Sequence, residues 1–212
     1  MISRCINPEC GLRVPLADED ALRTCPRCGS TVHTDSAPAF SQAIARFQEQ
    51  SGMPEVIPVL DNIRSALNVG SIFRTCEGAG IRKIYLCGIT PTPDNVKVRK
   101  TALGAEDSIR WQHDWSLRSV LEQLKSEGVT IFALEGGKYA QNLFCAIKSI
   151  PVMKKIALIV GNEVTGVDPE GISLSDHVVF LPMMGKKESL NVATAFGIAA
   201  YLMRFGGLCH EG

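Results

Sequence analysis

Short apolar runs alternate with stretches of helical spacing along most of the chain. The runs contain many β-branched residues and are bounded by Gly, Pro or charged residues, as buried parallel strands are. They lie at 56–60, 83–87, 129–134, 155–160 and 177–182. The stretches at 65–77, 116–126 and 191–205 have helical spacing and lie between or after these runs. This alternation predicts an α/β domain built on a mostly parallel sheet.

The N-terminal quarter of the chain does not follow this pattern. Four of the eight cysteines fall within the first 28 residues, and this clustering marks a separate small module at 1–35. Residues 36–52 are polar and rich in Ser, Ala and Gln, with a short helical pattern at 43–48, so we interpret them as a linker and a short helix. The main domain is expected at 53–212.

The clustered cysteines have the spacing of a structural zinc site. A tight C-x2-C turn directs two thiolates at one metal, and a second pair completes the tetrahedron that Zn²⁺ prefers. The predicted ligands are Cys5, Cys10, Cys25 and Cys28, with His33 as a possible replacement. So short a segment cannot bury enough surface to fold alone, so a metal would stabilise it. The alternative is free thiols or a redox pair, although no βαβ pattern surrounds Cys25 and Cys28.

Composition and charge exclude several classes of protein. Hydrophobic residues make up 45% of the chain, which is too apolar for a disordered protein. The 22 basic and 22 acidic residues cancel, so nucleic-acid binding would depend on local patches. The longest nearly apolar run, 192–203, is shorter than the roughly 20 residues of a membrane span. The N-terminus lacks the apolar core of a signal peptide, so we expect a cytoplasmic protein without membrane partners.

Residues 60–80 follow a predicted strand and open a helix at about Asn68. A strand-to-helix turn presents free backbone N–H groups and a positive dipole end, which suit a phosphate or a hydroxyl. Asn68 and Arg74 lie nearly two turns apart, so both side chains are expected to reach toward one pocket. The simpler interpretation is a helix with a capping Asn and a surface Arg.

Two later segments also place polar residues and glycines where a predicted strand ends. In 156–171 the strand ends in Gly161, Asn162 and Glu163, and ligands of open α/β sheets bind beyond such strand ends. In 177–205 a polar loop leads to Ser189 and Asn191, which are expected to cap a helix of small residues. Each segment alone could be an ordinary turn or a capped helix.

Together, and in this order, the three segments resemble the motifs of the SpoU-like RNA ribose 2′-O-methyltransferases of the SPOUT superfamily. The residues that carry the resemblance are N-V-G-S-I-F-R-T at 68–75, I-V-G-N-E-V-T-G at 159–166 and L-P-M-M-G-K-K-E-S-L-N-V-A at 181–193. The stretch at 97–107 is also similar to a segment that members carry between the first two motifs. The likeness spans about 150 residues, 56–205, and the cysteine module lies outside it.

The resemblance implies a fold, a cofactor and an oligomeric state. Members fold as an α/β sheet whose C-terminal segment forms a trefoil knot, which is an exception to unknotted topology. They work as homodimers and bind S-adenosylmethionine in a cup formed by the second and third motif loops. The positions implied to hold this cofactor are Leu134, Glu135, Gly136, Gly161, Leu181, Met183 and Leu190.

The resemblance also implies methyl transfer to a ribose 2′-hydroxyl of a structured RNA, either tRNA or rRNA. Family accounts assign proton removal to the arginine that matches Arg74, yet a guanidinium is a poor base. We therefore expect Arg74 to hold the adjacent phosphate and the hydroxyl through its N–H donors. Asn68 would orient Arg74 or the ribose, and Glu163 would hold the polar network. Ser189 and Asn191 would position the substrate.

RNA contacts are expected from two local cationic patches. The candidate residues are Lys97, Arg99, Lys100, Lys186 and Lys187. Each patch could instead be an ordinary solvated surface. The chief rival to an enzyme is a catalytically silent RNA-binding or assembly protein that has kept the fold, but all the polar residues of the motifs are present.

Overall fold

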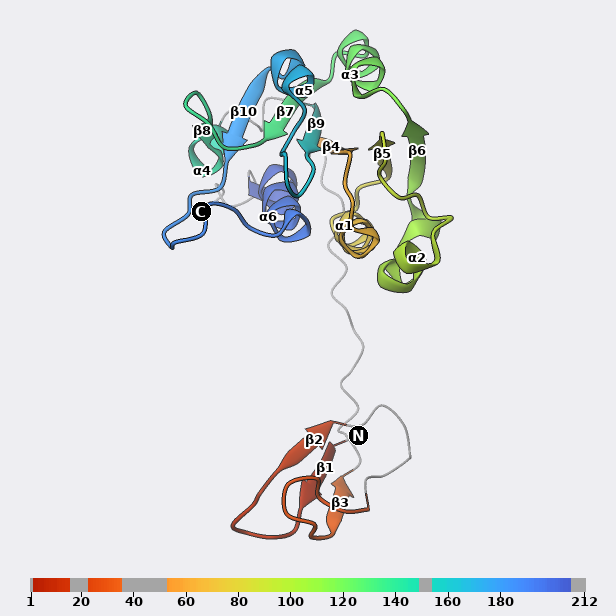
Figure 1. Ribbon diagram of the computed structural model, residues 1–212, viewed down its shortest axis with the longest axis vertical. Coiled ribbons are helices and arrows are strands. Elements are labelled where there is room, and N and C mark those ends of the chain that lie inside the picture. Colours follow the sequence, from red (N-terminus) through yellow and green to blue (C-terminus); the bar gives the residue numbers. More distant parts are fainter. Residues whose placement is uncertain (1, 16–22, 36–52, 149–153, 207–212) are drawn as a thin grey trace. The chain divides into compact units, whose positions relative to one another are not determined.

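The computed structural model describes residues 2–15, 23–35, 53–148 and 154–206 (Figure 1). The chain divides into two compact units, residues 1–48 and 49–212. The expected linker and short helix at 36–52 lie outside the described residues. None of the described helices is long and apolar enough to span a membrane.

The N-terminal unit contains a three-stranded antiparallel sheet. Strand β1 (Ile2–Cys5) lies in the middle, between β2 (Arg13–Pro15) and β3 (Val32–Asp35). A bridge between Thr24 and Thr31 closes the turn of the second cysteine pair, and Gly29 has a positive φ there, +73°. The cysteine spacing alone did not predict these strands, because each is only three or four residues long.

The second unit is built on a seven-stranded sheet in which every neighbouring pair is parallel. The strand order is β6-β5-β4-β9-β7-β10-β8. The strands are β4 (Glu55–Asp61), β5 (Lys83–Cys87), β6 (Arg110–Asp114), β7 (Thr130–Leu134), β8 (Gln141–Asn142), β9 (Lys155–Val160) and β10 (His177–Phe180). The five expected strands are present, and the sheet is parallel as predicted.

Helices cover both faces of this sheet, because its central strands are apolar on both sides. Helices α1 (Ala66–Gly78), α2 (Val96–Ala102) and α6 (Val192–Phe205) lie on one face, and α3 (Leu117–Ser126) and α5 (Pro169–Leu174) lie on the other (Figure 1). In β4, Val56 and Leu60 belong to the first core, whereas Ile57 and Val59 belong to the second. A short helix α4 (Leu143–Ala146) and a 3₁₀ turn η1 (Ala105–Ser108) complete the unit.

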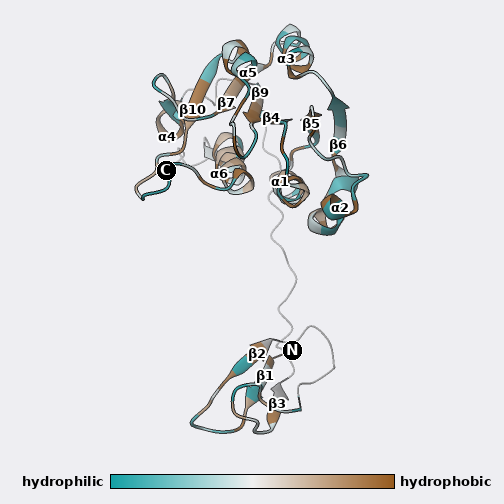
Figure 2. Cartoon of the chain, in the orientation of Figure 1, coloured by the Kyte–Doolittle hydropathy of each residue, from teal (hydrophilic) through white to brown (hydrophobic). Residues whose placement is uncertain are grey.

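Several elements differ from the sequence prediction. Strand β6, with the sequence RWQHD, was missed because it is a polar edge strand with exposed residues (Figure 2). Helices α2, α4 and α5 were missed because four to seven residues show too little periodicity. The last expected strand ends at Phe180, two residues early, since Pro182 cannot donate a ladder hydrogen bond. Helix α1 starts at Ala66 with Ser65 as its N-cap, rather than at Asn68.

Candidate functional site

A cavity of about 750 Å³ opens where β7, β9 and β10 end. These strands are neighbours in a parallel sheet, so their carboxyl ends meet at one edge, where ligands of such sheets bind. The cavity wall contains all seven positions expected to hold the cofactor, namely Leu134, Glu135, Gly136, Gly161, Leu181, Met183 and Leu190. Glu163, Ser189 and Asn191 line it as well. The sheet thus brings the second and third motifs together around one cavity.

The loop after β9 forms one wall of the cavity and is tightly folded. Asn162 and Gly166 exchange two backbone hydrogen bonds, of 3.0 and 2.9 Å. Gly166 has φ of +74°, a left-handed conformation that favours glycine. A Cβ at Gly161 would collide with the backbone of Gly166 and Val167, so only glycine fits there without a shift of the loop.

Two carboxylates hold the far end of this loop, and we call them the carboxylate clamp. Glu135, just after β7, accepts a 2.9 Å bond from the backbone N–H of Val167. Asp61, the last residue of β4, accepts a 2.8 Å bond from the backbone N–H of Asp168. Since β4 and β7 flank β9, the two carboxylates accept from the consecutive N–H groups of Val167 and Asp168 on opposite sides of the loop. The loop is therefore fixed to both neighbouring strands.

Asp61 is 1% exposed. Burial raises the pKa of its carboxyl, although the bonds from Asp168 and from the Asn62 amide act in the opposite direction. Asn62 accepts a further bond, of 2.7 Å, at its backbone carbonyl from the Asn162 side chain. Sequence reasoning missed both residues. The only available signal was their position directly after an apolar run.

A chain of hydrogen bonds joins the three motifs at the rim of the cavity. The Asn68 amide of α1 donates to Glu163 at 2.9 Å, and the Asn191 amide donates to the Asn68 oxygen at 3.1 Å. Asn191 is also the N-cap of α6, since its oxygen accepts from the N–H groups of Ala193 and Thr194. Residues 123 positions apart thereby contact each other directly.

Glu163 is the acceptor at the centre of this chain. The backbone N–H groups of Arg64 and Ser65, which precede α1, donate to its carboxylate at 2.9 and 3.1 Å. Burial tends to raise the pKa of Glu163, but the bonds from Arg64, Asn68 and Ser65 outweigh it, so this pKa is lowered. Glu163 is therefore ionised at neutral pH and complements the positive end of the α1 dipole.

Arg74 does not lie at this cavity, contrary to the expectation that Asn68 and Arg74 reach toward one pocket. Its side chain is exposed and lines a second cavity of about 440 Å³, together with Glu77 and the turn after α2. Six residues along an α-helix turn the direction of a side chain by about 240°, so the two residues point to different sides of α1. Asn68 contacts Glu163 and Asn191 instead.

The remaining expected residues lie on the surface. Ser189 is exposed at the cavity wall, and the predicted cap of α6 is provided by Asn191 rather than Ser189. The three cations Lys97, Arg99 and Lys100 are exposed on α2. Lys186 and Lys187 are exposed in the loop between β10 and α6.

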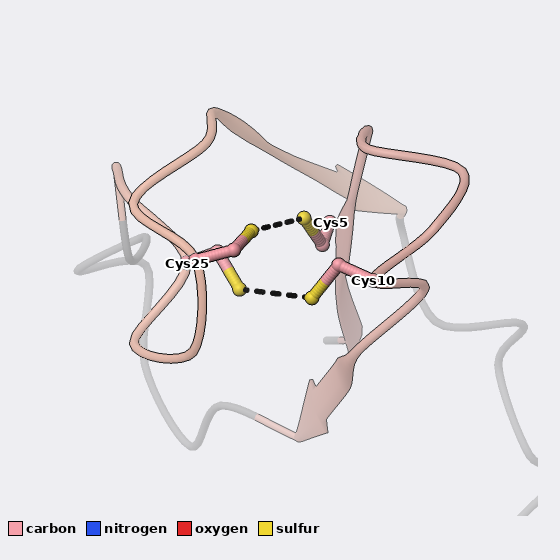
Figure 3. A group of neighbouring side chains, drawn as sticks. Cys5, Cys10 and Cys25 are labelled. Atoms are coloured by element: carbon pink, nitrogen blue, oxygen red, sulfur yellow. Dashed lines mark hydrogen bonds between the residues drawn. The ribbon is translucent and has the colours of Figure 1, made fainter.

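The four clustered cysteines come together in the N-terminal unit, as Figure 3 shows for three of them. All four sulfurs lie within 4.8 Å of one another. The distance is 3.5 Å between Cys5 and Cys28 and 3.7 Å between Cys10 and Cys25. A tetrahedron of sulfurs at 2.3 Å from a zinc ion has edges of about 3.8 Å, so the donor set fits this metal.

The surroundings shift the pKa values of the clustered thiols in opposite directions. Hydrogen bonds from the Ser30 side chain and backbone lower the pKa of Cys28 to about 6, whereas burial raises the pKa of Cys5 to about 12. Four thiolates this close together would repel one another without a cation between them. A bound dication would remove this repulsion.

Comparison with known proteins agrees with the arrangement around the larger cavity. The sequence model of the SpoU rRNA Methylase family matches residues 55–201, which include all three motifs. This chain belongs to the SpoU rRNA methylase family. One relative is the 23S rRNA (guanosine(2553)-2′-O)-methyltransferase RlmP of Bacillus subtilis. It is 30% identical over an aligned length of 199 residues, which covers 92% of this chain and 74% of the relative. The tRNA (guanosine(18)-2′-O)-methyltransferase of Aquifex aeolicus is 30% identical over 151 residues, 69% of this chain and 67% of the relative.

Solved structures of SpoU proteins resemble this chain in fold. The AdoMet-bound rRNA methyltransferase of Sinorhizobium meliloti superposes with a TM-score of 0.66 at 26% identity, over 73% of this SpoU chain and 57% of that chain. The TrmH/SpoU tRNA modifying enzyme of A. aeolicus gives a TM-score of 0.63 at 25% identity, over 72% of this chain and 77% of that chain.

Proposed function

We propose that this protein is an enzyme that transfers a methyl group from S-adenosylmethionine to a ribose 2′-hydroxyl of tRNA or rRNA. The observation that carries the proposal is the hydrogen-bonded chain from Glu163 through Asn68 to Asn191, which joins the three motifs beside the large cavity. Relatives named as 2′-O-methyltransferases of 23S rRNA and tRNA support the reaction class.

The residues around the large cavity fit the cofactor. Its volume of about 750 Å³ lies within the range of small-molecule sites. Leu134, Leu181 and Leu190 offer apolar contacts, and Gly161 allows the tight fold of the loop that forms one wall. Bound S-adenosylmethionine would supply an electrophilic methyl group. Glu135, Gly136 and Met183 complete the wall that would hold it.

Catalysis would depend mainly on positioning, because methyl transfer requires the ribose oxygen to be aligned in a pocket that excludes water. Because Arg74 is exposed but lies away from the cofactor cavity of its own chain, we assign it to the site of the second chain in the homodimer proposed below, where it would bind the phosphate and hydroxyl of the target nucleotide. Asn68 and Glu163 would hold the rim of the cofactor cavity. Ser189 and Asn191 would face the substrate.

RNA contacts in this unit would come from two groups of exposed cations. Phosphate binding requires cations that solvent can reach, and the five candidates meet this requirement. These candidates are Lys97, Arg99, Lys100, Lys186 and Lys187.

The protein would act as a homodimer with one structural zinc ion per chain. Helices α1 and α6 pack side by side, but they leave three apolar side chains exposed, namely Leu67 on α1 and Ile198 and Tyr201 on α6. Exposed apolar residues that lie together often belong to an interface. The four sulfurs of the N-terminal unit would hold the zinc ion. Such a closed Cys₄ site would be structural rather than catalytic.

One assay tests the proposed function. The purified full-length protein is incubated with S-adenosylmethionine labelled in its methyl group and with separated tRNA and rRNA fractions. We expect label to enter one fraction at a single ribose. A protein that binds RNA without any uptake of S-adenosylmethionine in calorimetry would contradict the proposal and favour a silent RNA-binding protein.

Substitution of Arg74 tests the assigned active site. We expect Arg74→Ala to lower the turnover of methyl transfer by about 100-fold or more, as the loss of a transition-state donor does. Calorimetric binding of S-adenosylmethionine should stay unchanged, because Arg74 does not line the larger cavity. Wild-type turnover of this variant would refute the assignment.

A further inference from the structure

The sheet of the N-terminal unit places three basic residues side by side. Strand register pairs Arg4 with Arg13 on one side and with His33 on the other. Arg13, Arg4 and His33 therefore form one row across β2, β1 and β3, which we call the basic row. Adjacent strands are about 4.8 Å apart, so the row spans roughly 10 Å.

The basic row lies on the outer face of the sheet. Successive residues of a strand point to opposite faces, and the neighbours of Arg4 in β1, Ser3 and Cys5, are both buried. Arg4, Arg13 and His33 are all exposed. The cysteine cluster, which includes Cys5, thus holds the sheet from one face while the basic row occupies the other.

Arginine outnumbers the acidic residues in the described part of this unit. Among the side chains that the structure describes in 2–15 and 23–35, Glu9 is the acidic one, and it forms no ion pair with Arg4 or Arg13. These two ranges contain four arginines, while Glu9 and Asp35 are their only acidic residues. Like charges directly opposite each other in a sheet are unfavourable. A polyanion that contacts several of them at once would remove this cost.

We propose that the basic row is a binding surface for the phosphate backbone of the RNA substrate. A row of guanidinium groups suits phosphates because each donates several N–H bonds in a planar fork. The surface carries no base-reading geometry, so it positions the RNA without selecting its sequence. This inference rests on the proposed function for the identity of the RNA as substrate.

The test compares the full-length protein with its Arg4→Ala/Arg13→Ala variant in binding a short fluorescein-labelled polyuridine RNA. The slope of log K against log salt is negative, and each lost phosphate contact reduces its magnitude by about 0.7 for single strands. We expect this magnitude to fall by about 1.4 and binding to weaken about tenfold. The KM for the methylated RNA fraction should rise similarly, with kcat and S-adenosylmethionine binding unchanged.

Three controls separate charge in the row from other effects. Arg4→Lys/Arg13→Lys should keep most of the binding. Arg23→Ala/Arg110→Ala removes the same number of exposed arginines outside the row and should keep the wild-type KM. The zinc content of each variant shows whether the N-terminal unit is still folded.

An unchanged slope and KM in Arg4→Ala/Arg13→Ala would overturn the proposal. A changed sedimentation coefficient with a normal KM would overturn it as well, because the row would then contact another copy of the chain. If the wild-type protein methylates no RNA fraction but the magnitude of the polyuridine slope is still smaller in Arg4→Ala/Arg13→Ala than in wild type, the proposed reaction fails while the binding surface stands.

Discussion

Asp61 is a buried carboxylate that holds the loop after β9 in place. Burial of a charge is costly unless the charge is hydrogen-bonded, and Asp61 accepts bonds from the Asp168 backbone and the Asn62 side chain. With Glu135 it clamps the loop that forms one wall of the proposed cofactor cavity. Its role would therefore be to position this loop.

We expect Asp61→Asn to weaken S-adenosylmethionine binding about tenfold in calorimetry, as the loss of a hydrogen bond to a charged group does. The matched control is Asp114→Asn, at the end of edge strand β6, whose carboxylate accepts the Ser116 backbone N–H away from the cavity. Equal losses of cofactor binding in both variants would contradict a specific role for Asp61.

The stability of Asp61→Asn relative to wild type is also predicted to depend on pH. Because the folded pKa of Asp61 is raised, its charge costs stability at pH values above the folded pKa. This cost is absent at low pH, where the carboxyl is protonated in both states, and it grows as pH rises from the unfolded value of 3.8 through the folded pKa. The free energy of unfolding of Asp61→Asn, relative to wild type, should thus increase with pH across this window. Urea unfolding at several pH values checks this, and a relative stability that falls with pH would contradict it.

Helices α1 and α6 contribute to the site and also carry the exposed apolar residues of the proposed interface. Their first turns meet at Asn68 and Asn191, beside the large cavity. Further along, Gly197 approaches Thr75 and Gly78 approaches Tyr201, so small residues allow the close packing. This packing leaves Leu67, Ile198 and Tyr201 exposed.

If these apolar side chains form the proposed dimer interface, Ile198→Asp should shift the protein toward monomer in sedimentation velocity. A buried unpaired carboxylate in an interface is strongly unfavourable. Val96→Asp on α2 is the control, since Val96 is also exposed but lies outside this helix pair. A wild-type protein that sediments as a monomer, or equal dimerisation of both variants, would contradict the interface.

At the scale of the whole molecule, the two units differ in what stabilises them. Residues 49–212 contain two apolar cores, one on each face of the sheet. In the described part of residues 1–48 the buried hydrophobic side chains are Cys5 and Cys25, so the predicted metal would replace a core.

The zinc site gives a prediction at this scale. The purified protein should contain about one zinc ion per chain by elemental analysis, and Cys28→Ser should lower this content. Removal of the metal by a chelator should unfold the N-terminal unit, seen as lost amide protection at 1–35 in hydrogen exchange. Calorimetric binding of S-adenosylmethionine should persist, because the cavity residues all lie in the second unit. Full protection at 1–35 in metal-free protein would rule out a structural zinc.

The trefoil knot implied by the family resemblance stays a prediction. A parallel sheet of this order establishes the α/β fold, but it does not by itself describe how the C-terminal segment passes the preceding loops.

The amino-acid sequence by itself determined the apolar strands and the cysteine cluster, and its resemblance to the SpoU family pointed to part of the lining of the large cavity. Strand hydrophobicity and ligand chemistry are local properties that can be read from neighbouring positions. Only the tertiary structure decided three further points: the bond from Asp168 to Asp61, 107 positions apart, the alignment of Arg13, Arg4 and His33, and the separation of Arg74 from Asn68. These depend on strand order, register and helix rotation, which arise from packing of the whole chain and which no local pattern encodes.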